Sequence, residues 1–146
     1  MYKVMVATEE HIPWIRDVAA TRMLKEEVYK PEYVNHTQIE HLIRQGIATN
    51  TMWIVLKNDV PVGALGALAV PSLFNPTIRT LMEIFWWVDP DHRTGRAGAM
   101  LLTTYVAEAD NYDEATLTLL TTSNVMNETL LKKGFHLREF GFRKEG

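Results

Sequence analysis

The stretch from Leu81 to Leu102, LMEIFWWVDPDHRTGRAGAMLL, constrains the fold of this chain more than any other. Its first part, Met82 to Val88, is aromatic and aliphatic with one acid, which is typical of a strand buried on both faces. Pro90 ends the strand, because proline has no N–H to donate to a ladder. A short basic loop with glycines follows, and from Ala99 onward the apolar spacing predicts a helix.

A strand, a basic glycine loop and a helix N-terminus in this order predict an anion site. The first N–H groups of a helix have no helical partner, and the helix dipole adds about half a positive charge. Arg93 and Arg96 add full charges, and we expect both side chains to face solvent. The ligand implied is a phosphate, most simply a pyrophosphate.

Two familiar phosphate loops do not fit this segment. The P-loop needs a lysine and then Ser or Thr after its last glycine, whereas Gly98 is followed by alanine and methionine. The dinucleotide fingerprint needs three glycines near the start of a βαβ unit. Only Gly95 and Gly98 are present, and they lie two-thirds along the chain.

The segment resembles the acetyl-CoA-binding segment of the GCN5-related N-acetyltransferases, the GNAT family. The family pattern is a strand ending in valine, a proline-containing turn, Arg or Gln-x-x-Gly-x-Gly or Ala, and a helix. Val88 ends the strand here, and Arg93 and Gly98 take the first and last motif positions. Arg96 takes the position of the family's middle glycine, and a glycine lies one residue earlier, at Gly95. This variant is similar to the loops of phage-encoded members. The alternative is a surface loop that merely joins a strand to a helix.

The resemblance implies acetyl-CoA as cosubstrate and assigns residues to it. The backbone of Val88 and its neighbours would bind the pantetheine arm. Asn124 or Asn127, near the start of the last helix, could hydrogen-bond the same arm, or could be a helix cap and a first-turn polar residue. The loop residues assigned to the phosphates are Arg93, Thr94, Gly95, Arg96, Ala97, Gly98 and Ala99.

Glu83 is the candidate catalytic base. It is the only carboxylate in the strand before the loop, and family members often place Glu or His there, near the amine. A carboxylate half-buried among Trp and Phe has a raised pKa, which suits it to take a proton directly or through water. Alternatively, Glu83 lies at an exposed strand start or pairs with Arg79. Trp86 and Trp87 alternate sides of the sheet, so we expect one in the core and the other free to line an acceptor pocket.

A second resemblance lies at Lys132-Lys133-Gly134-Phe135, where the family often ends its last helix. The family's tyrosine, four residues before that glycine, commonly protonates the leaving thiolate. Leu130 stands there and has no proton to give. The 12 residues after Gly134 have room for one strand, where many members have two. We therefore expect one of three consequences: an open sheet edge, a homodimer partner or a shortened acceptor site.

The rest of the chain predicts an α/β (α+β) fold in a single domain, residues 1–146, with a mixed, mostly antiparallel sheet and about four helices. The predicted order is β-α-α-β-β-β-α-β-α-β, which resembles the family's order. The segments are strands over 2–7, 52–57, 60–70, 78–88, 115–120 and 135–143, and helices over 9–27, 37–46, 98–111 and 124–134.

Composition excludes several classes of function. With 146 residues, a net charge of −3 and no cysteine, we expect no nucleic-acid partner, thiolate site or cysteine nucleophile. No apolar run approaches the roughly 18 residues of a membrane helix, so we expect a cytoplasmic protein without a membrane partner. Nothing gathers His11, His36 and His41, and no metal site is expected.

These observations favour an acetyl-CoA-dependent N-acetyltransferase that moves an acetyl group directly to a primary amine of a small-molecule or protein acceptor. The second hypothesis is a GNAT-fold protein without catalysis, acting as a binding or structural module such as a phage accessory protein. The third is another enzyme with a phosphate ligand. Cofactor binding with turnover separates the first hypothesis from the second.

Overall fold

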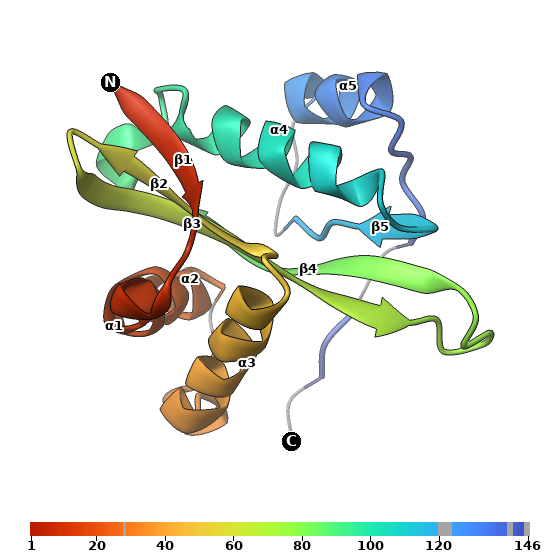
Figure 1. Ribbon diagram of the computed structural model, residues 1–146, viewed down its shortest axis with the longest axis horizontal. Coiled ribbons are helices and arrows are strands. Elements are labelled where there is room, and N and C mark those ends of the chain that lie inside the picture. The colour runs from red at the N-terminus through yellow and green to blue at the C-terminus, as the bar shows by residue number, and fades with distance from the viewer. Residues whose placement is uncertain (28, 120–123, 140–141, 145–146) are drawn as a thin grey trace.

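The computed structural model describes residues 1–27, 29–119, 124–139 and 142–144. A five-stranded sheet runs through the molecule in the order β1-β2-β3-β4-β5 (Figure 1). The first four strands pair antiparallel with their neighbours, and β5 pairs parallel with β4. The strands are β1 (Tyr2–Val6), β2 (Met52–Lys57), β3 (Val60–Pro71), β4 (Arg79–Val88) and β5 (Glu114–Thr116).

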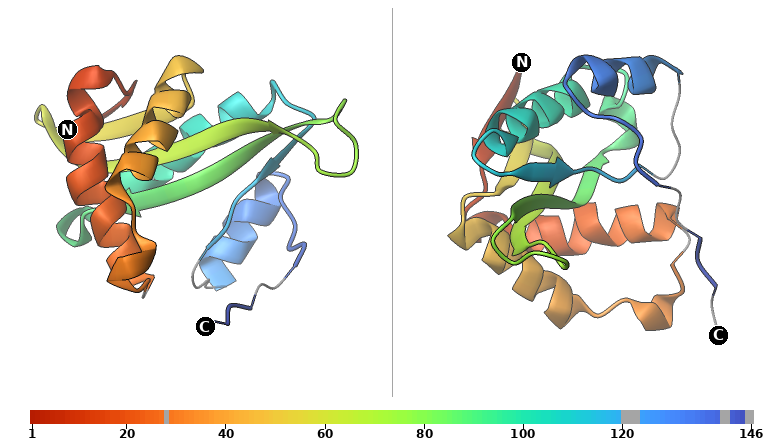
Figure 2. Two further views of the ribbon diagram at one scale, coloured as in Figure 1. Left: turned by 90° about the horizontal axis from the view of Figure 1, so that it is seen from below. Right: turned by 90° about the vertical axis from the view of Figure 1, so that its right-hand side faces the viewer.

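Helices cover both faces of the sheet (Figures 1 and 2). One face carries a continuous helix made of α1 (Ile12–Trp14), the π-helical η2 (Ile15–Ala20) and α2 (Thr21–Glu26), followed by α3 (His36–Ala48). The other face carries α4 (Ala97–Ala109) and α5 (Asn124–Lys132). The short 3-10 helices are η1 (Glu9–His11), η3 (Pro31–Tyr33) and η4 (Pro90–His92).

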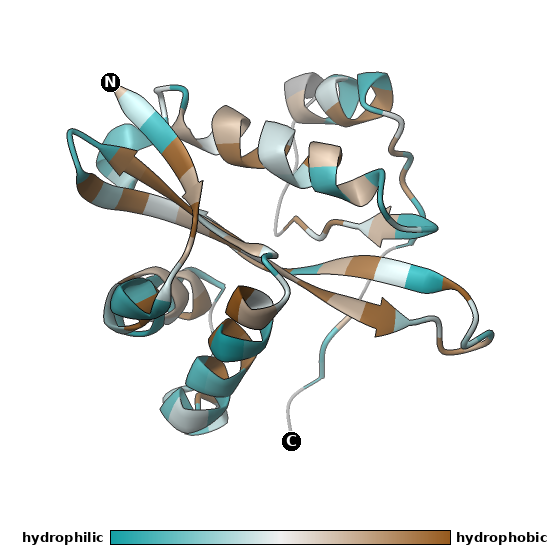
Figure 3. Ribbon diagram, in the orientation of Figure 1, coloured by the Kyte–Doolittle hydropathy of each residue, from teal (hydrophilic) through white to brown (hydrophobic). Residues whose placement is uncertain are grey.

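Two hydrophobic clusters lie on opposite faces of the central strands. Figure 3 shows hydrophobic residues along these strands and hydrophilic residues over much of α3. One cluster, which includes Trp53, Leu65 and Tyr105, packs the sheet against α4. The other, which includes Ile15 and Ile43, packs it against the first helix and α3. Because both faces are covered, β2 is buried over five consecutive residues instead of alternating.

The chain follows the predicted order as far as α5. The predicted hairpin is present: Asn58 and Asp59, with φ of 51° and 68°, join β2 to β3, and such left-handed residues match the twist of paired strands. No helix in the described part of the chain is long and apolar enough to cross a membrane.

The predicted last strand is wrong for the residues that the structure describes. Residues 135–139 and 142–144 form no strand, and the strand predicted over 115–120 is regular only at Glu114–Thr116. A strand needs a neighbour for its backbone groups, and β5 offers only three residues. Leu137 illustrates the result, because its side chain is 74% exposed although its spacing suggests a buried position.

A β-bulge in the middle of β4 changes the face of the sheet on which the following side chains lie. Ala67 pairs with Glu83 and Gly66 pairs with Phe85, so that Ile84 has no partner across the ladder. A bulge adds one residue to one strand and shifts which face the following side chains take. Beyond the bulge Trp86 packs with the α4-side cluster and Trp87 with the opposite one, which confirms their predicted alternation.

We expect Gly66→Ala to lower the free energy of unfolding by about 1–3 kcal/mol, because the core beside the bulge is overpacked by any side chain there. A Cβ at Gly66 would lie 2.6 Å from Met52 Sδ and 2.7 Å from Phe85 Cε1. Urea unfolding measures the change. Gly98→Ala is the control, since its Cβ would lie 3.7 Å from Val88 Cγ2, an ordinary contact. Equal stability of the two variants would contradict this packing.

Candidate active site

The sheet forks where β4 and β5 separate. The two strands pair only from Thr80 to Met82 on β4 and from Glu114 to Thr116 on β5. β4 continues to Val88 along β3 alone. The Asp89 N–H donates to the carbonyl of Val62, and backbone groups alternate direction along a strand, so the Val88 groups point toward the fork. The fork therefore opens an edge of β4 inside the sheet, where an extended ligand could pair.

A cavity of about 170 Å³ lies at this fork. It brings together three of the predicted site residues, Glu83, Val88 and Arg93. Two acids that the sequence did not single out, Glu26 and Glu27 at the end of the first helix, line it as well. Both tryptophans of β4 line it too, whereas we expected one in the core and only the other at a pocket. The remaining lining residues are Met23, Thr118 and Leu119.

Glu83 is a buried acid at the centre of this arrangement. Its side chain is 9% exposed, and Oε1 accepts a hydrogen bond of 3.1 Å from the Thr118 N–H, just beyond β5. Burial raises the pKa of Glu83 to about 7; the Thr118 bond opposes this rise, and the charge of Glu27 adds to it. Glu83 is therefore neither at an exposed strand start nor paired with Arg79, whose guanidinium lies over the Tyr112 ring.

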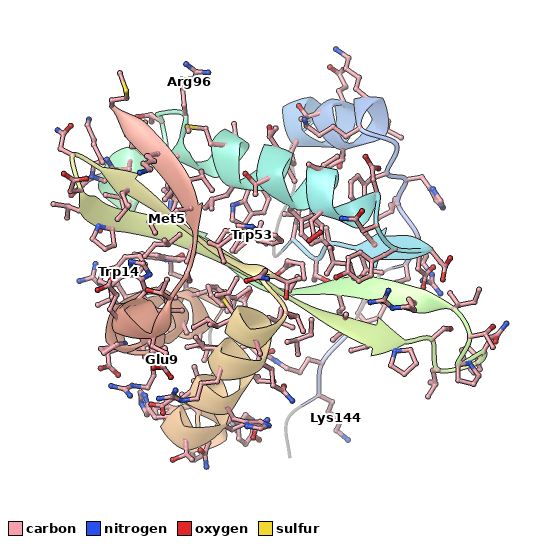
Figure 4. The ribbon with its side chains drawn as sticks, viewed as in Figure 1. Met5, Glu9, Trp14, Trp53, Arg96 and Lys144 are labelled. Atoms are coloured by element: carbon pink, nitrogen blue, oxygen red, sulfur yellow. The ribbon has the colours of Figure 1, made fainter. Side chains whose placement is uncertain are left out.

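The basic loop starts α4 as predicted. Asp89 caps η4 by accepting a 3.0 Å hydrogen bond from the Asp91 N–H, and α4 begins at Ala97. The first bond along the helix runs from the Met100 N–H to the Arg96 carbonyl. The N–H groups of the first turn precede it and have no partner within the helix. Thr94 and Arg96 are exposed beside this turn, and Figure 4 shows Arg96 projecting away from the body.

Arg93 is exposed as expected, with 44% of its side chain accessible, but its guanidinium is also bonded to the protein. Its Nε donates a 2.7 Å hydrogen bond to the carbonyl of Val88, and its Nη2 donates to both oxygens of Glu26 at 2.7 and 2.8 Å. The Trp87 indole N–H donates to Glu26 as well, at 3.2 Å. Arg93 thus fastens the loop to the first helix and occupies a backbone oxygen that the cofactor was expected to use.

The two loop glycines differ in what the protein itself requires of them. A Cβ at Gly95 would lie 2.7 Å from Tyr2 Oη, and that hydroxyl is 3.1 Å from His92 Nδ1. Tyr2 therefore accounts for the absence of a side chain at Gly95. A Cβ at Gly98 would make only ordinary contacts with Val88 and Trp86. Nothing in the described protein excludes a side chain there.

The last helix is placed as predicted. α5 begins at Asn124, whose side chain lies outside what the structure describes. Gly134 ends the helix with φ of 91°, and the Phe135 N–H donates to the Leu130 carbonyl, a glycine cap. Leu130 is part of this helix and partly buried.

The sequence did not predict three participants of this site: Glu26, Glu27 and Thr118. Helix periodicity marks the two acids only as residues of an ordinary polar face. Thr118 contributes its backbone, which no side-chain pattern encodes. In the described residues, no group of three or more His, Asp or Glu side chains is arranged to hold a metal ion.

The raised pKa of Glu83 predicts how stability depends on pH. Between pH 4.5 and about 7 the folded protein keeps a proton that the unfolded chain has released, so the free energy of unfolding falls as pH rises through this window. The full effect is about 3 kcal/mol. Urea unfolding at pH 5 and pH 8 should show it in the parent and not in Glu83→Gln. Identical pH slopes in the two proteins would refute the assignment.

The chain was compared with known proteins. The sequence model of the acetyltransferase (GNAT) family matches residues 18–142. No curated protein matches the chain.

Solved structures share the fold across nearly the whole chain. A predicted acetyltransferase with acetyl-CoA from Clostridium acetobutylicum is 18% identical, with a TM-score of 0.74 over 99% of this chain and 96% of that one. A GCN5-related N-acetyltransferase from Ralstonia eutropha JMP134 is 14% identical, with a TM-score of 0.74 over 99% and 98%. Arabidopsis thaliana Naa50, in complex with the bisubstrate analogue CoA-Ac-MVNAL, is 14% identical, with a TM-score of 0.66 over 94% and 85%. Since the family model covers most of the chain and the fold agrees, this protein belongs to the acetyltransferase (GNAT) family.

Proposed function

We propose that this protein is an acetyl-CoA-dependent N-acetyltransferase that acetylates a primary amine of a small-molecule or protein acceptor by direct transfer. The observation that carries the proposal is the buried carboxylate of Glu83 in the cavity at the β4–β5 fork. The loop before α4, which we propose binds the phosphates, contributes Arg93 to the lining of the same cavity. A proton acceptor and a phosphate site at one fork suit transfer from a CoA thioester to an amine.

The residues present fit acetyl-CoA. The first-turn N–H groups of Ala97, Gly98 and Ala99, with Thr94, Gly95 and the charge of Arg96, would hold the pyrophosphate. Because no protein atom excludes a side chain at Gly98, the close approach of a phosphate is the simplest reason for glycine there. The backbone of Trp86 and Val88 would pair with the pantetheine arm along the open edge of β4. Asn124 would donate to the same arm from the start of α5.

Arg93 has to change partners for this ligand. Its guanidinium now neutralises Glu26 and bonds the Val88 carbonyl. A phosphate is a stronger competitor than a carboxylate for the same donors when it also contacts a helix N-terminus. We propose that the pyrophosphate accepts some of the hydrogen bonds that this guanidinium now donates to Glu26. Glu26 would then keep its hydrogen bond from the Trp87 indole.

Glu83 would supply the base. The acceptor ammonium would give one proton to the carboxylate, which passes it to water. The neutral amine nitrogen would then form a bond to the acetyl carbon as the carbon–sulfur bond breaks, and Glu83 would take the second proton, which the nitrogen loses as the amide forms. A backbone N–H on the open edge of β4 would polarise the thioester oxygen. The leaving group departs as a thiolate, because Leu130 has no proton to give; a thiol with a pKa of about 8.5 tolerates this at modest cost.

A binding module without catalysis is the second candidate, and Leu130 is the observation that favours it. The two candidates differ in turnover and not in cofactor affinity. Thiol release from acetyl-CoA in the presence of amine panels, after a thermal shift with acetyl-CoA, distinguishes them. Binding without turnover of any amine would favour the module.

We expect Arg96→Glu to weaken acetyl-CoA binding about tenfold, because it reverses an exposed charge beside the phosphates without breaking a bond of the fold. Gly98→Val should weaken binding at least as much while leaving the melting temperature nearly unchanged. Calorimetric titration measures both. Arg44→Glu on α3 is a charge reversal on the other layer; it breaks the ion pairs of Arg44 with Glu9 and Glu40 but should bind acetyl-CoA like the parent. If all three variants bind alike, the phosphates lie elsewhere.

We expect Glu83→Gln to lower turnover at pH 7 by at least about tenfold, while acetyl-CoA affinity changes less than about twofold. The parent rate should rise with pH through about 7, as the carboxylate loses its proton. Raising the pH should restore part of the activity of the variant, since more of the amine is then neutral. Equal turnover of parent and variant at every pH would assign the base to another group or to water.

A further inference from the structure

Tyr105 on α4 reaches the point where the sheet forks. Its ring is fully buried and packs edge-on against Trp53, between the sheet and α4. Its hydroxyl lies 3.0 Å from the Leu81 carbonyl on β4 and within hydrogen-bond distance of the Thr116 carbonyl on β5. These residues belong to the last pairs of the β4–β5 ladder. The side chain of a helix therefore joins the two strands where their own pairing stops.

The hydroxyl is a donor that the two carbonyls share. A phenol has one proton, so its contacts with the Leu81 and Thr116 carbonyls are two parts of one shared hydrogen bond across the fork. Burial and the charge of Glu83 raise the pKa of the Tyr105 phenol. Tyr105 thus joins β4, two residues before Glu83, to the last residue of β5.

We propose that Tyr105 is the positioning residue of Glu83: by joining β4 to β5 it fixes where the fork opens and holds the Thr118 N–H on the carboxylate. Thr118 follows Thr116 by two residues on the same extended segment, and its N–H reaches Glu83 Oε1 at 3.1 Å. The catalytic part of this inference rests on the proposed function; the structural part does not.

Removal of the hydroxyl should loosen the fork. In Tyr105→Phe the ring still fills its site, but the buried carbonyls of Leu81 and Thr116 lose their shared donor, and such groups are costly to leave unmatched. The strands then separate and water reaches Glu83. Loosening the fork also weakens the Thr118 hydrogen bond, which favours the charged carboxylate. Burial is the larger of the two influences on the pKa of Glu83, so the net change should lower that pKa toward its ordinary value.

Other charged groups lie near Glu83, and they are the same in the parent and in Tyr105→Phe. Glu26 and Glu27 face it from the end of the first helix, and Arg93 faces it from the loop before α4. Arg143 approaches from the C-terminal segment, where its Nη2 donates to the Glu27 carbonyl at 3.4 Å. None of these groups is altered by the loss of one hydroxyl on α4.

The test is a carbon-13 NMR titration of the Glu83 carboxyl in the parent and in Tyr105→Phe. We expect the pKa to fall by at least about half a unit, with a shifted and faster-exchanging Thr118 amide. Tyr112→Phe is the control, because Tyr112 packs on the same cluster with its ring under Arg79. An unchanged or higher pKa in Tyr105→Phe would overturn the inference.

A second variant keeps the inference testable if Tyr105→Phe folds poorly. Thr118→Pro removes the N–H that Tyr105 is proposed to position and leaves Tyr105 in place. Since that N–H favours the charged carboxylate, its loss should raise the pKa of Glu83 by about half a unit or more. An unchanged pKa would overturn the proposed link between Thr118 and Glu83.

Kinetics separate this inference from the proposed function. The inflection of kcat/KM with pH should move with the pKa of Glu83 in Tyr105→Phe. In the Glu83→Gln background, the same change should leave the pH profile as it is. If the role of Tyr105 were purely structural, Tyr105→Phe would lower kcat/KM by the same factor in the parent and in the Glu83→Gln variant. That result would count against a positioning role. If the parent turns over no amine, the proposed function fails, and the NMR titration still decides the role of Tyr105.

Discussion

The site depends on one physical constraint: a carboxylate is held out of water at the place where two strands part. β5 pairs with β4 for only three residues, so the next residue of β4, Glu83, lies beside the fork instead of within a ladder. The bulge at Ile84 then shifts the following side chains by one face. Burial penalises the charged form of Glu83, and one N–H from Thr118 prevents the pKa from rising still further. A carboxyl group whose pKa is raised by burial and lowered by one hydrogen bond in this way gains or loses its proton near neutral pH.

At the fork, a charged side chain of one layer pairs with a charged side chain of the other. Arg93 neutralises Glu26, and the Trp87 indole supplies Glu26 with another donor. These contacts join the loop before α4 to the first helix, on opposite layers of the sheet. A ligand on the loop would therefore affect the wall of the cavity through Arg93, although the two segments are 67 residues apart in the chain. If phosphates bind this loop as proposed, the same side chain would link their affinity to the charge of Glu26 beside Glu83.

Neighbouring glycines in one motif can be present for different reasons. Gly95 leaves room for Tyr2 from β1, so its smallness is accounted for by packing within the protein. Gly98 has room for a Cβ, so packing within the described protein does not account for it. A motif read from sequence treats the two alike. The space around each residue shows which of the two glycines the packing of the protein itself requires.

The order of the elements through α5, the β2–β3 hairpin, the glycine end of α5 and the strand–loop–helix segment that marks the family could all be predicted from the sequence. These features depend on local chemistry: alternation, proline, left-handed turn residues and capping. Glu83 could also be singled out, because a lone acid in an apolar strand is unusual. Folding in three dimensions was needed to show that Arg93 bonds Glu26, that the Thr118 N–H reaches Glu83, that Tyr105 joins β4 to β5, and that residues 135–139 form no strand. Each of these depends on residues far apart in the chain or on backbone groups, and neither appears in the spacing of side chains along a sequence.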